Sequence, residues 1–323
     1  MTKYVISGYI GFDNFGDEAI VSVLTSYLKA NNAERITVLS SNPIKTSKLY
    51  NVQSAHYLNF LMPILKSDVL ISGGGSLLQD ITSLKSLLYY LLVILTGLIL
   101  NKKVIIFAQG FTPFRTTIGK IFTKFILKYC DKIYVRDFKS YEVLKDLTLN
   151  SEIISDPVFG MDVPYSNEKQ GIGIQLRSFP TISDNFLNKL SDIIMEKFPN
   201  QILKLYSLQD SIDLPIIEKF VGILNKKNIK YEIYKNLDIN TTINEISKLE
   251  YLIGMRFHAN LVASKAGVKV LGINYDIKVQ NLSQAIGFPI IELDDTDFEK
   301  EFNKLMNLNP QEYKIPNFKF PTF

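Results

Sequence analysis

Short β-rich runs alternate with helix-length amphipathic stretches along the 323 residues of the chain. In the first half, five apolar runs predict strands, at residues 4–7, 36–39, 69–71, 104–108 and 133–135. Each run is followed closely by Gly, Ser or Arg, and most lead into a helical pattern. This alternation is typical of a parallel, doubly wound sheet.

A second series of the same kind follows residues 162–170, a polar stretch with one proline that is the best candidate for a linker. Its predicted strands are residues 172–176, 202–206, 231–234, 251–253, 268–273 and 289–293. We therefore expect an α/β protein of two Rossmann-like, doubly wound domains, residues 1–162 and 171–323. Their strand carboxyl ends are expected to face a common cleft.

The composition suits a globular protein, because 46% of the residues are hydrophobic and can form two cores. The net charge of +4 is mild and spread along the chain, so no nucleic-acid partner is expected. Cys130 is the single cysteine, which excludes an internal disulfide and indicates a reducing, cytoplasmic setting. The amino terminus breaks at Gly8, before a signal-peptide core could form, and export is not expected.

Residues 86–100 form an apolar run without a charged side chain. The run is shorter than the roughly 18 residues expected of a membrane span, and Thr96 and Gly97 interrupt it. A buried helix is favoured over a membrane-contacting one, although peripheral contact with the inner face of the cell membrane stays open.

Two glycine-rich turns follow predicted strands and can bring a ligand close to backbone N–H groups. In the first, residues 8–19, Gly8 and Gly11 lack the spacing of a dinucleotide fingerprint. Asp17 there either caps the following helix or acts as a base toward a ligand. The second turn, residues 72–80, has three consecutive glycines before Ser76, which can cap the next helix. This turn favours an oxyanion or a sugar, or it serves close packing alone.

Arginine is scarce, since 36 basic residues include five arginines and 36 − 5 = 31 lysines. Four of the five follow strand-like runs: Arg115, Arg136, Arg177 and Arg256. Each of them either binds a ligand or pairs with a carboxylate to fix a loop. Arg256 and His258 come directly after residues 251–253, and their spacing of two places both on one side of an extended segment. Lys278 lies at the next strand end, so an anion clamp with a proton donor is expected. No cluster has metal-ligand spacing, and no metal is expected.

Four motifs together resemble the polysaccharide pyruvyl transferases, and most closely the bacterial branch that modifies secondary cell-wall polymers. They are residues 14–19 (NFGDEA), residues 72–80 (SGGGSLLQD), Arg136-Asp137 with Ser140, and residues 254–258 (GMRFH). The resemblance implies a glycosyltransferase-B-like fold, phosphoenolpyruvate as donor and a lipid-linked sugar precursor as acceptor. In that branch the acceptor is typically an N-acetylmannosamine, which is converted to its 4,6-ketal.

The resemblance maps catalytic roles onto His258 and Asp17, with the division between acid and base left open. Phosphoenolpyruvate binding is assigned to Arg136, Arg177, Arg256 and Lys278, and acceptor or loop roles to Gly11, Asn14, Gly16, Gly74, Gly75, Ser76 and Gln79. The first domain is the expected acceptor side and the second the donor side, with no cofactor beyond the co-substrate. Two alternatives stay open: a nucleotide-sugar-dependent glycosyltransferase, and a non-catalytic glycan-binding protein on the same frame.

Overall fold

The computed structural model describes residues 2–81, 83–294, 297–321 and 323. The chain divides into two units, residues 1–161 with 317–323 and residues 162–316. The sequence assigned all of residues 171–323 to the second domain, but the last seven residues belong to the first unit. Phe320 explains why, because its ring stacks on Tyr27 with the centroids 3.7 Å apart and lies parallel to Phe107 at 5.9 Å.

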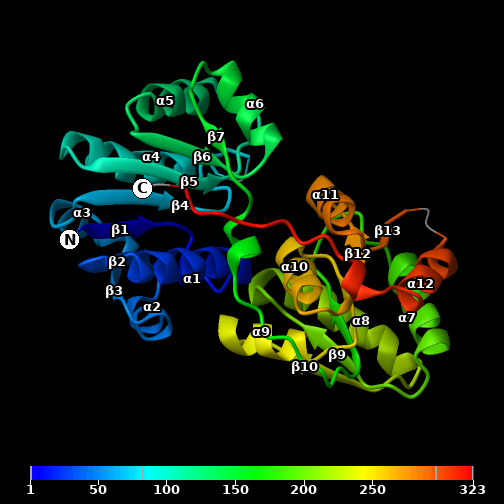
Figure 1. Cartoon of the computed structure of the whole chain (residues 1–323). Helices are drawn as coiled ribbons and strands as arrows, with labels where there is room; N and C mark the ends of the chain where they lie inside the picture. The colour runs from blue at the N-terminus through cyan, green and yellow to red at the C-terminus, as the bar shows by residue number, and fades with distance from the viewer. Residues whose placement is uncertain (1, 82, 295–296, 322) are drawn as a thin grey trace. The chain divides into compact units, whose positions relative to one another are not determined.

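The first unit contains a parallel sheet of seven strands in the order β3-β2-β1-β4-β5-β6-β7 (Figure 1). The strands are β1 (Lys3–Ser7), β2 (Arg35–Ser40), β3 (Gln53–His56), β4 (Val69–Gly73), β5 (Lys103–Gln109), β6 (Lys132–Val135) and β7 (Glu152–Ile153). The order reverses between β1 and β4, and ligands of open α/β sheets bind at the strand carboxyl ends beside such a switch.

The helices of the first unit connect these strands in sequence (Figure 1). They are α1 (Phe15–Ala30), α2 (Pro43–Tyr50), α3 (Leu61–Leu65), α4 (Leu84–Ile99), α5 (Thr117–Leu127) and α6 (Phe138–Asp146), with 3-10 turns at Tyr57–Asn59 and Pro157–Gly160. One hydrophobic core joins the sheet to buried side chains of α4, α5 and α6, among them Leu87, Ile126 and Leu144.

Helix α4 contains most of the apolar run at residues 86–100, so the expected helix is present, but only part of its surface is buried. Leu87, Tyr90 and Leu91 are buried, whereas Leu92 is 51% exposed and Ile99 is 69% exposed. No helix in the described part of the chain is long and apolar enough to cross a membrane.

The second unit repeats the plan with a parallel sheet of six strands in the order β10-β9-β8-β11-β12-β13. The strands are β8 (Ile172–Gln175), β9 (Leu203–Tyr206), β10 (Tyr231–Tyr234), β11 (Tyr251–Gly254), β12 (Lys269–Asn274) and β13 (Ile290–Glu292). The helices are α7 (Asp184–Lys197), α8 (Asp210–Lys226), α9 (Ile239–Ser247), α10 (Phe257–Lys265), α11 (Ile277–Ile286) and α12 (Phe298–Met306), followed by a 3-10 turn at Pro310–Glu312.

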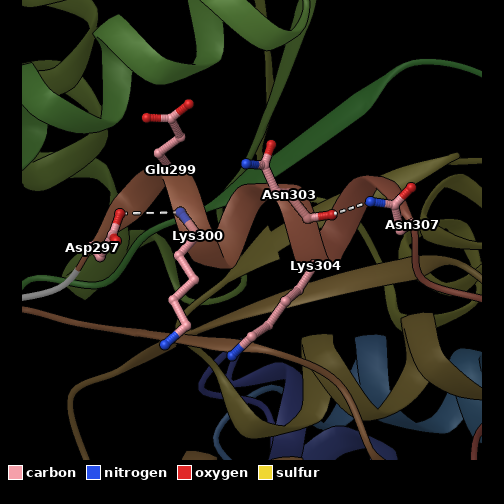
Figure 2. Close-up of a pocket in the computed structure, with 6 residues that line it drawn as sticks. All are labelled: Asp297, Glu299, Lys300, Asn303, Lys304 and Asn307. Atoms are coloured by element: carbon pink, nitrogen blue, oxygen red, sulfur yellow. Dashed lines mark hydrogen bonds between the residues drawn. The ribbon is translucent and has the colours of Figure 1, made fainter.

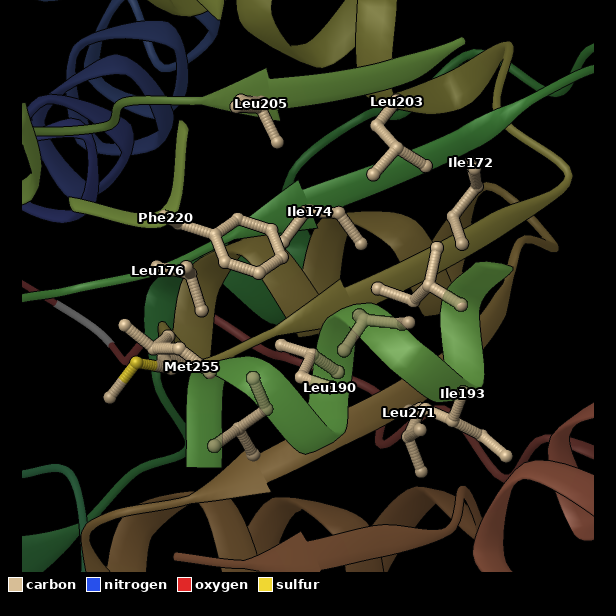
Figure 3. Close-up of a cluster of buried hydrophobic side chains, with 14 of the residues drawn as sticks. Ile172, Ile174, Leu176, Leu190, Ile193, Leu203, Leu205, Phe220, Met255 and Leu271 are labelled. Atoms are coloured by element: carbon tan, nitrogen blue, oxygen red, sulfur yellow. The ribbon is translucent and has the colours of Figure 1, made fainter. Parts of the chain in front are cut away.

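Alternate side chains of these strands enter one core, which Figure 3 shows. Ile172, Ile174 and Leu176 from the β8 segment meet Leu190 and Ile193 of α7 there. Because the flanking helices bury both faces of such a sheet, its strands are continuous apolar runs in the sequence. The expected α/β class with two Rossmann-like units is therefore confirmed.

Candidate functional site

The loop after β1 folds back onto the first turns of α1. A β-carbon at Gly11, where φ is +80°, would lie 2.2 Å from the Oγ of Ser40, so the loop requires glycine at this position. The Gly11 N–H donates to Oε1 of Glu18 at 2.7 Å. Asn14 caps α1 by accepting a hydrogen bond from the Gly16 N–H at 3.0 Å. These contacts give Gly11, Asn14 and Gly16 structural roles in shaping the loop.

The glycine turn after β4 passes directly beside Asp17. Gly74 and Gly75 have φ angles of +62° and +76°, which favour glycine. A β-carbon at Gly75 would lie 2.4 Å from Oδ1 of Asp17. Since Asn14 is the helix cap, the capping alternative for Asp17 is wrong. The Asp17 carboxylate instead lies against the backbone of the turn, at the carboxyl ends of β1 and β4.

Arg136 follows β6 and reaches the same turn. Its Nη2 donates to the Oγ of Ser76 at 2.9 Å. Gly110 makes room for the guanidinium, because a β-carbon there would lie 2.7 Å from Nη2. Two carboxylates flank Arg136, with Asp137 Oδ2 3.5 Å from Nε and the buried Asp156 Oδ2 3.9 Å from Nη1. A fixed cation therefore stands at the strand ends of the first unit.

Ser76 of the glycine turn does not have the expected capping role, and Gln79 hydrogen-bonds within the turn. Ser76 does not cap α4, because Ser83 does so by accepting from the Ser86 N–H at 3.3 Å. The side chain of Gln79 accepts from the Ile81 N–H at 2.7 Å and thereby closes a local turn. Ser76 thus remains available to orient Arg136.

Aromatic rings of the first loop lie close to Asp17. Tyr9 and Phe12 stack with their centroids 4.3 Å apart and their planes 8° from parallel. Burial, and then the charge of Asp17, raises the pKa of Tyr9. The same carboxylate also contributes to the raised pKa of Tyr90, after burial. These electrostatic couplings place Asp17 near aromatic side chains, which the sequence motifs had not included.

In the second unit, Arg256 is held by a buried carboxylate. Its Nε lies 2.9 Å from Oδ2 of Asp213, and its Nη2 lies 2.6 Å from Oδ1 of Asp213. Asp213 is 0% exposed and also accepts from the Leu208 N–H at 2.9 Å. The Oε1 of Gln209 accepts from Arg256 Nη2 at 3.3 Å. The Oε1 of Gln175 accepts from the backbone N–H of Arg256 at 2.8 Å. The bonds described for the guanidinium engage Nε and Nη2.

Arg177 follows β8 and lies beside the end of β11 and the loop after β12. Its backbone N–H contacts the sulfur of Met255 at 3.2 Å. Its Nη1 donates to the Tyr275 hydroxyl at 3.3 Å, and its guanidinium carbon lies 5.7 Å from the centre of the Tyr275 ring. Its Nε is buried, and no acceptor for it is present among the described residues. A buried donor without an acceptor is costly, and a bound anion would supply the acceptor.

His258 and Lys278 lie in the first turns of two helices that start at neighbouring strand ends. His258 belongs to the first turn of α10, with its ring edge-to-face on Phe257 and its Nε2 shielded from solvent. Lys278 is exposed in the first turn of α11, which Asp276 caps by accepting from the Lys278 N–H at 3.0 Å. Arg177, Arg256, His258 and Lys278 are thus at the carboxyl edge of three adjacent strands, where helix N-termini favour anions.

A hollow on the surface of α12 lies apart from these residues. Figure 2 shows its lining, which is Asp297, Glu299, Lys300, Asn303, Lys304 and Asn307. All six come from one helix and its cap, and none is a predicted site residue. We therefore place the candidate site at the strand ends.

Comparison with known proteins agrees with the motifs. The family model described as polysaccharide pyruvyl transferase matches residues 14–277, which include all the expected site residues except Gly11 and Lys278. The chain belongs to this family. It is accordingly a pyruvyl transferase, and the non-catalytic alternative is set aside. No curated protein sequence matches the chain closely enough to count as a relative.

Solved structures share the fold of the transferase at low identity. A protein from Listeria monocytogenes, titled as a candidate UDP-N-acetylglucosamine 2-epimerase, is similar with a TM-score of 0.67 and 11% identity over 95% of this chain and 89% of that one. UDP-GlcNAc 2-epimerase from Methanocaldococcus jannaschii is similar with a TM-score of 0.63 and 11% identity, covering 99% and 95%. Anabaena HepE, solved with UDP and glucose, has a TM-score of 0.63 and 8% identity, covering 98% and 92%. These similarities support a glycosyltransferase-B-like fold.

The residues assigned to the donor belong to both units. Arg177, Arg256 and Lys278 lie in the second unit, whereas Arg136 lies in the first unit with Ser76. The assignment of Arg136 to the donor therefore stays a prediction. Sequence reasoning also missed Asp213, although an acidic residue in the first turn of a helix after a strand end was a signal worth noting.

Proposed function

We propose that this transferase moves the pyruvyl group of phosphoenolpyruvate onto a sugar and closes a 4,6-ketal, with an N-acetylmannosamine of a lipid-linked cell-wall glycan precursor as acceptor. The proposal requires no resident cofactor, because phosphoenolpyruvate is a co-substrate. The observation that carries the proposal is the buried Nε of Arg177, which has no hydrogen-bond partner among the described residues. This N–H group needs a hydrogen-bond acceptor at the strand ends, and an anion would supply one.

Phosphoenolpyruvate suits the second unit because it has two anionic groups, a phosphate and a carboxylate. Arg177 and Arg256 are planar donors on adjacent strands, and such donors bind oxyanions in a bidentate manner. Asp213 already accepts hydrogen bonds from Nε and Nη2 of Arg256, so these two nitrogens are not available for a bidentate contact with phosphoenolpyruvate. Arg177 and the N-terminus of α10 would then supply most of the donor's hydrogen bonds.

The reaction needs two protons delivered, one to the methylene carbon and one to the leaving phosphate, and two protons removed, one from each acceptor hydroxyl. Protonation of the methylene carbon makes C2 electrophilic, a sugar hydroxyl adds to C2 and loses its proton, and phosphate leaves. The neighbouring hydroxyl then adds and loses its proton, so the products are the ketal and inorganic phosphate. We assign the first proton to His258 at the start of α10, and proton removal from the acceptor to Asp17.

The first unit offers features that suit the acceptor. The stacked rings of Tyr9 and Phe12 present aromatic surface against which the apolar side of a sugar ring can pack. Asp17 lies near Tyr9 and beside Gly75, which has no side chain of its own to block the approach of a hydroxyl. These residues support the acceptor role proposed for residues 1–162.

The test is a coupled assay with phosphoenolpyruvate and short N-acetylhexosamine acceptors, including N-acetylmannosamine, in which phosphate release and ketal formation are followed. We expect His258→Ala to lose turnover by about a thousandfold, within the range for removal of a general acid, while donor binding by calorimetry is retained. His56→Ala is the matched control, because His56 accepts from the Leu58 N–H at 3.4 Å and its ring lies tilted against Tyr57 in the first unit. Near-wild-type rates for His258→Ala would reject the assignment.

The second candidate function is glycosyl transfer from a nucleotide-sugar. It is favoured by the similar structures, which include a UDP-GlcNAc 2-epimerase and Anabaena HepE in complex with UDP and glucose. Calorimetry separates the two functions, because tight UDP binding without phosphoenolpyruvate binding would support this candidate and contradict our proposal.

A further inference from the structure

Helix α5 exposes an apolar stripe although it belongs to the wall of a packed core. Its buried side is made by Gly119, Thr123, Ile126 and Leu127. On the opposite side Ile118, Ile121, Phe122 and Phe125 are 53%, 59%, 48% and 59% exposed. These four positions follow the spacing i, i+3, i+4 and i+7, which places them on one face of the helix.

The neighbouring helix α4 packs against α5 and also exposes apolar side chains. Leu88 and Leu92, one turn apart, are 39% and 51% exposed. We define the α4–α5 surface by these two leucines with Ile118, Ile121, Phe122 and Phe125. A large contiguous area of exposed apolar side chains marks a site that binds a protein, a membrane or a ligand.

The segment that carries the α4–α5 surface is rich in basic residues. Residues 81–130 contain seven basic residues and no acidic one, although the whole chain has a net charge of +4. The seven are Lys85, Lys102, Lys103, Arg115, Lys120, Lys124 and Lys128. Lys120, Lys124 and Lys128 are exposed on α5 or directly after it and flank the apolar stripe.

We propose that the α4–α5 surface docks onto an anionic lipid bilayer, with the apolar side chains at the level of the headgroups and the lysines against the lipid phosphates. An amphipathic helix with aromatic residues on one face and lysines beside it lies in the plane of such an interface. A second copy of this chain suits the surface poorly, because a two-fold contact would bring two sets of lysines together.

This proposal is independent of the proposed function, because its test requires no substrate. The full-length protein is sedimented with vesicles of phosphatidylcholine containing phosphatidylglycerol, and with vesicles of phosphatidylcholine alone. We expect binding to the anionic vesicles, weaker binding to the neutral ones, and a loss of binding as salt is raised. Absence of binding to anionic vesicles would overturn the proposal.

Two double variants separate charge from apolar contact. Each lysine near an anionic bilayer contributes roughly fivefold to binding, so Lys120→Glu with Lys124→Glu should weaken binding by about 25-fold or more. The matched control, Lys189→Glu with Lys226→Glu, makes the same charge change at exposed positions of α7 and α8 and should retain binding within about threefold. Equal losses in the two variants would show that net charge alone is responsible.

The apolar contribution is tested by Phe122→Ser with Phe125→Ser, which should weaken vesicle binding by roughly tenfold or more. Its control is Met195→Ser with Ile202→Ser, at positions 48% and 45% exposed in the second unit. Circular dichroism checks that each variant is folded. If the native protein proves to be a dimer that the two phenylalanine substitutions make monomeric, the surface binds a second copy and the lipid proposal is wrong.

Discussion

Replacing Asp213 by Asn removes the charge that compensates Arg256 while it keeps the size of the side chain. The carboxylate is 0% exposed, and it accepts from Nε and Nη2 of Arg256 at 2.9 and 2.6 Å. It also accepts from the N–H groups of Leu208 and Gln209 at 2.9 and 3.1 Å. An amide nitrogen in place of one oxygen would therefore face donors as well as leave the guanidinium unpaired.

The cost follows from burial. Breaking a buried ion pair on one side costs about 3–5 kcal/mol, because the remaining charge stays desolvated without a partner. We expect the Asp213→Asn variant to lose this amount of unfolding free energy. We also expect weaker phosphoenolpyruvate binding, since Arg256 would no longer be held at the strand end.

The assay is urea unfolding followed by circular dichroism, together with calorimetric titration of phosphoenolpyruvate. Asp192→Asn is the matched control, because it makes the same chemical change in an exposed pair, where Asp192 Oδ1 lies 2.6 Å from the Nζ of Lys227. Such a surface pair contributes about 0–1 kcal/mol. Equal losses in the two variants would refute the view that a buried pair holds Arg256.

Two further substitutions test the first unit. Gly75→Ala introduces a β-carbon 2.4 Å from Oδ1 of Asp17 at a φ of +76°. It should therefore lower the unfolding free energy measured in urea by about 1–2 kcal/mol and reduce turnover. The control is Gly222→Ala on α8, where the new β-carbon meets nothing within 4 Å and the change should be neutral or stabilising. Burial raises the pKa of Glu18 against the opposing hydrogen bonds from Tyr50 and the Gly11 N–H. Because the folded pKa is the higher one, the stability that Glu18 contributes is fully present below its unfolded pKa and is lost as the pH rises through the folded pKa. The unfolding free energy of the wild type relative to Glu18→Gln should therefore fall from acidic to neutral pH, and a flat difference would contradict this.

The sequence predicted the strands that the helices bury on both faces, because such strands are continuous apolar runs. Val69–Gly73 and Tyr251–Gly254 are examples, and their buried positions left a clear pattern. The edge strands Gln53–His56 and Glu152–Ile153 were missed, because an exposed or half-exposed edge carries no such run. The turn after β4 was also predicted, since three consecutive glycines after a strand are typical of a turn.

Placement of Arg177, Arg256 and His258 at strand ends was readable as well, because parallel strands in a doubly wound sheet end at one edge. The hydrogen-bond partners of such residues could not be predicted from the sequence. Asp213 is 43 residues from Arg256 in the chain, and a buried pair over that separation depends on how α8 packs against the end of β11. Ser76 was expected to cap a helix, and the fold instead gives it to Arg136, 60 residues away.

Local patterns in this chain therefore determined the elements, their order and the chemistry available at the strand ends, because periodicity and turn residues act over a few positions. Tertiary packing decided which side of each helix is covered. The sequence singled out residues 86–100 as apolar, but the stripe of Phe122 and Phe125 became visible once α5 had buried its other side. Tertiary packing also decided that the last seven residues belong to the first unit. The ring of Phe320 stacks on Tyr27, a contact between residues far apart in the chain that no local pattern predicts.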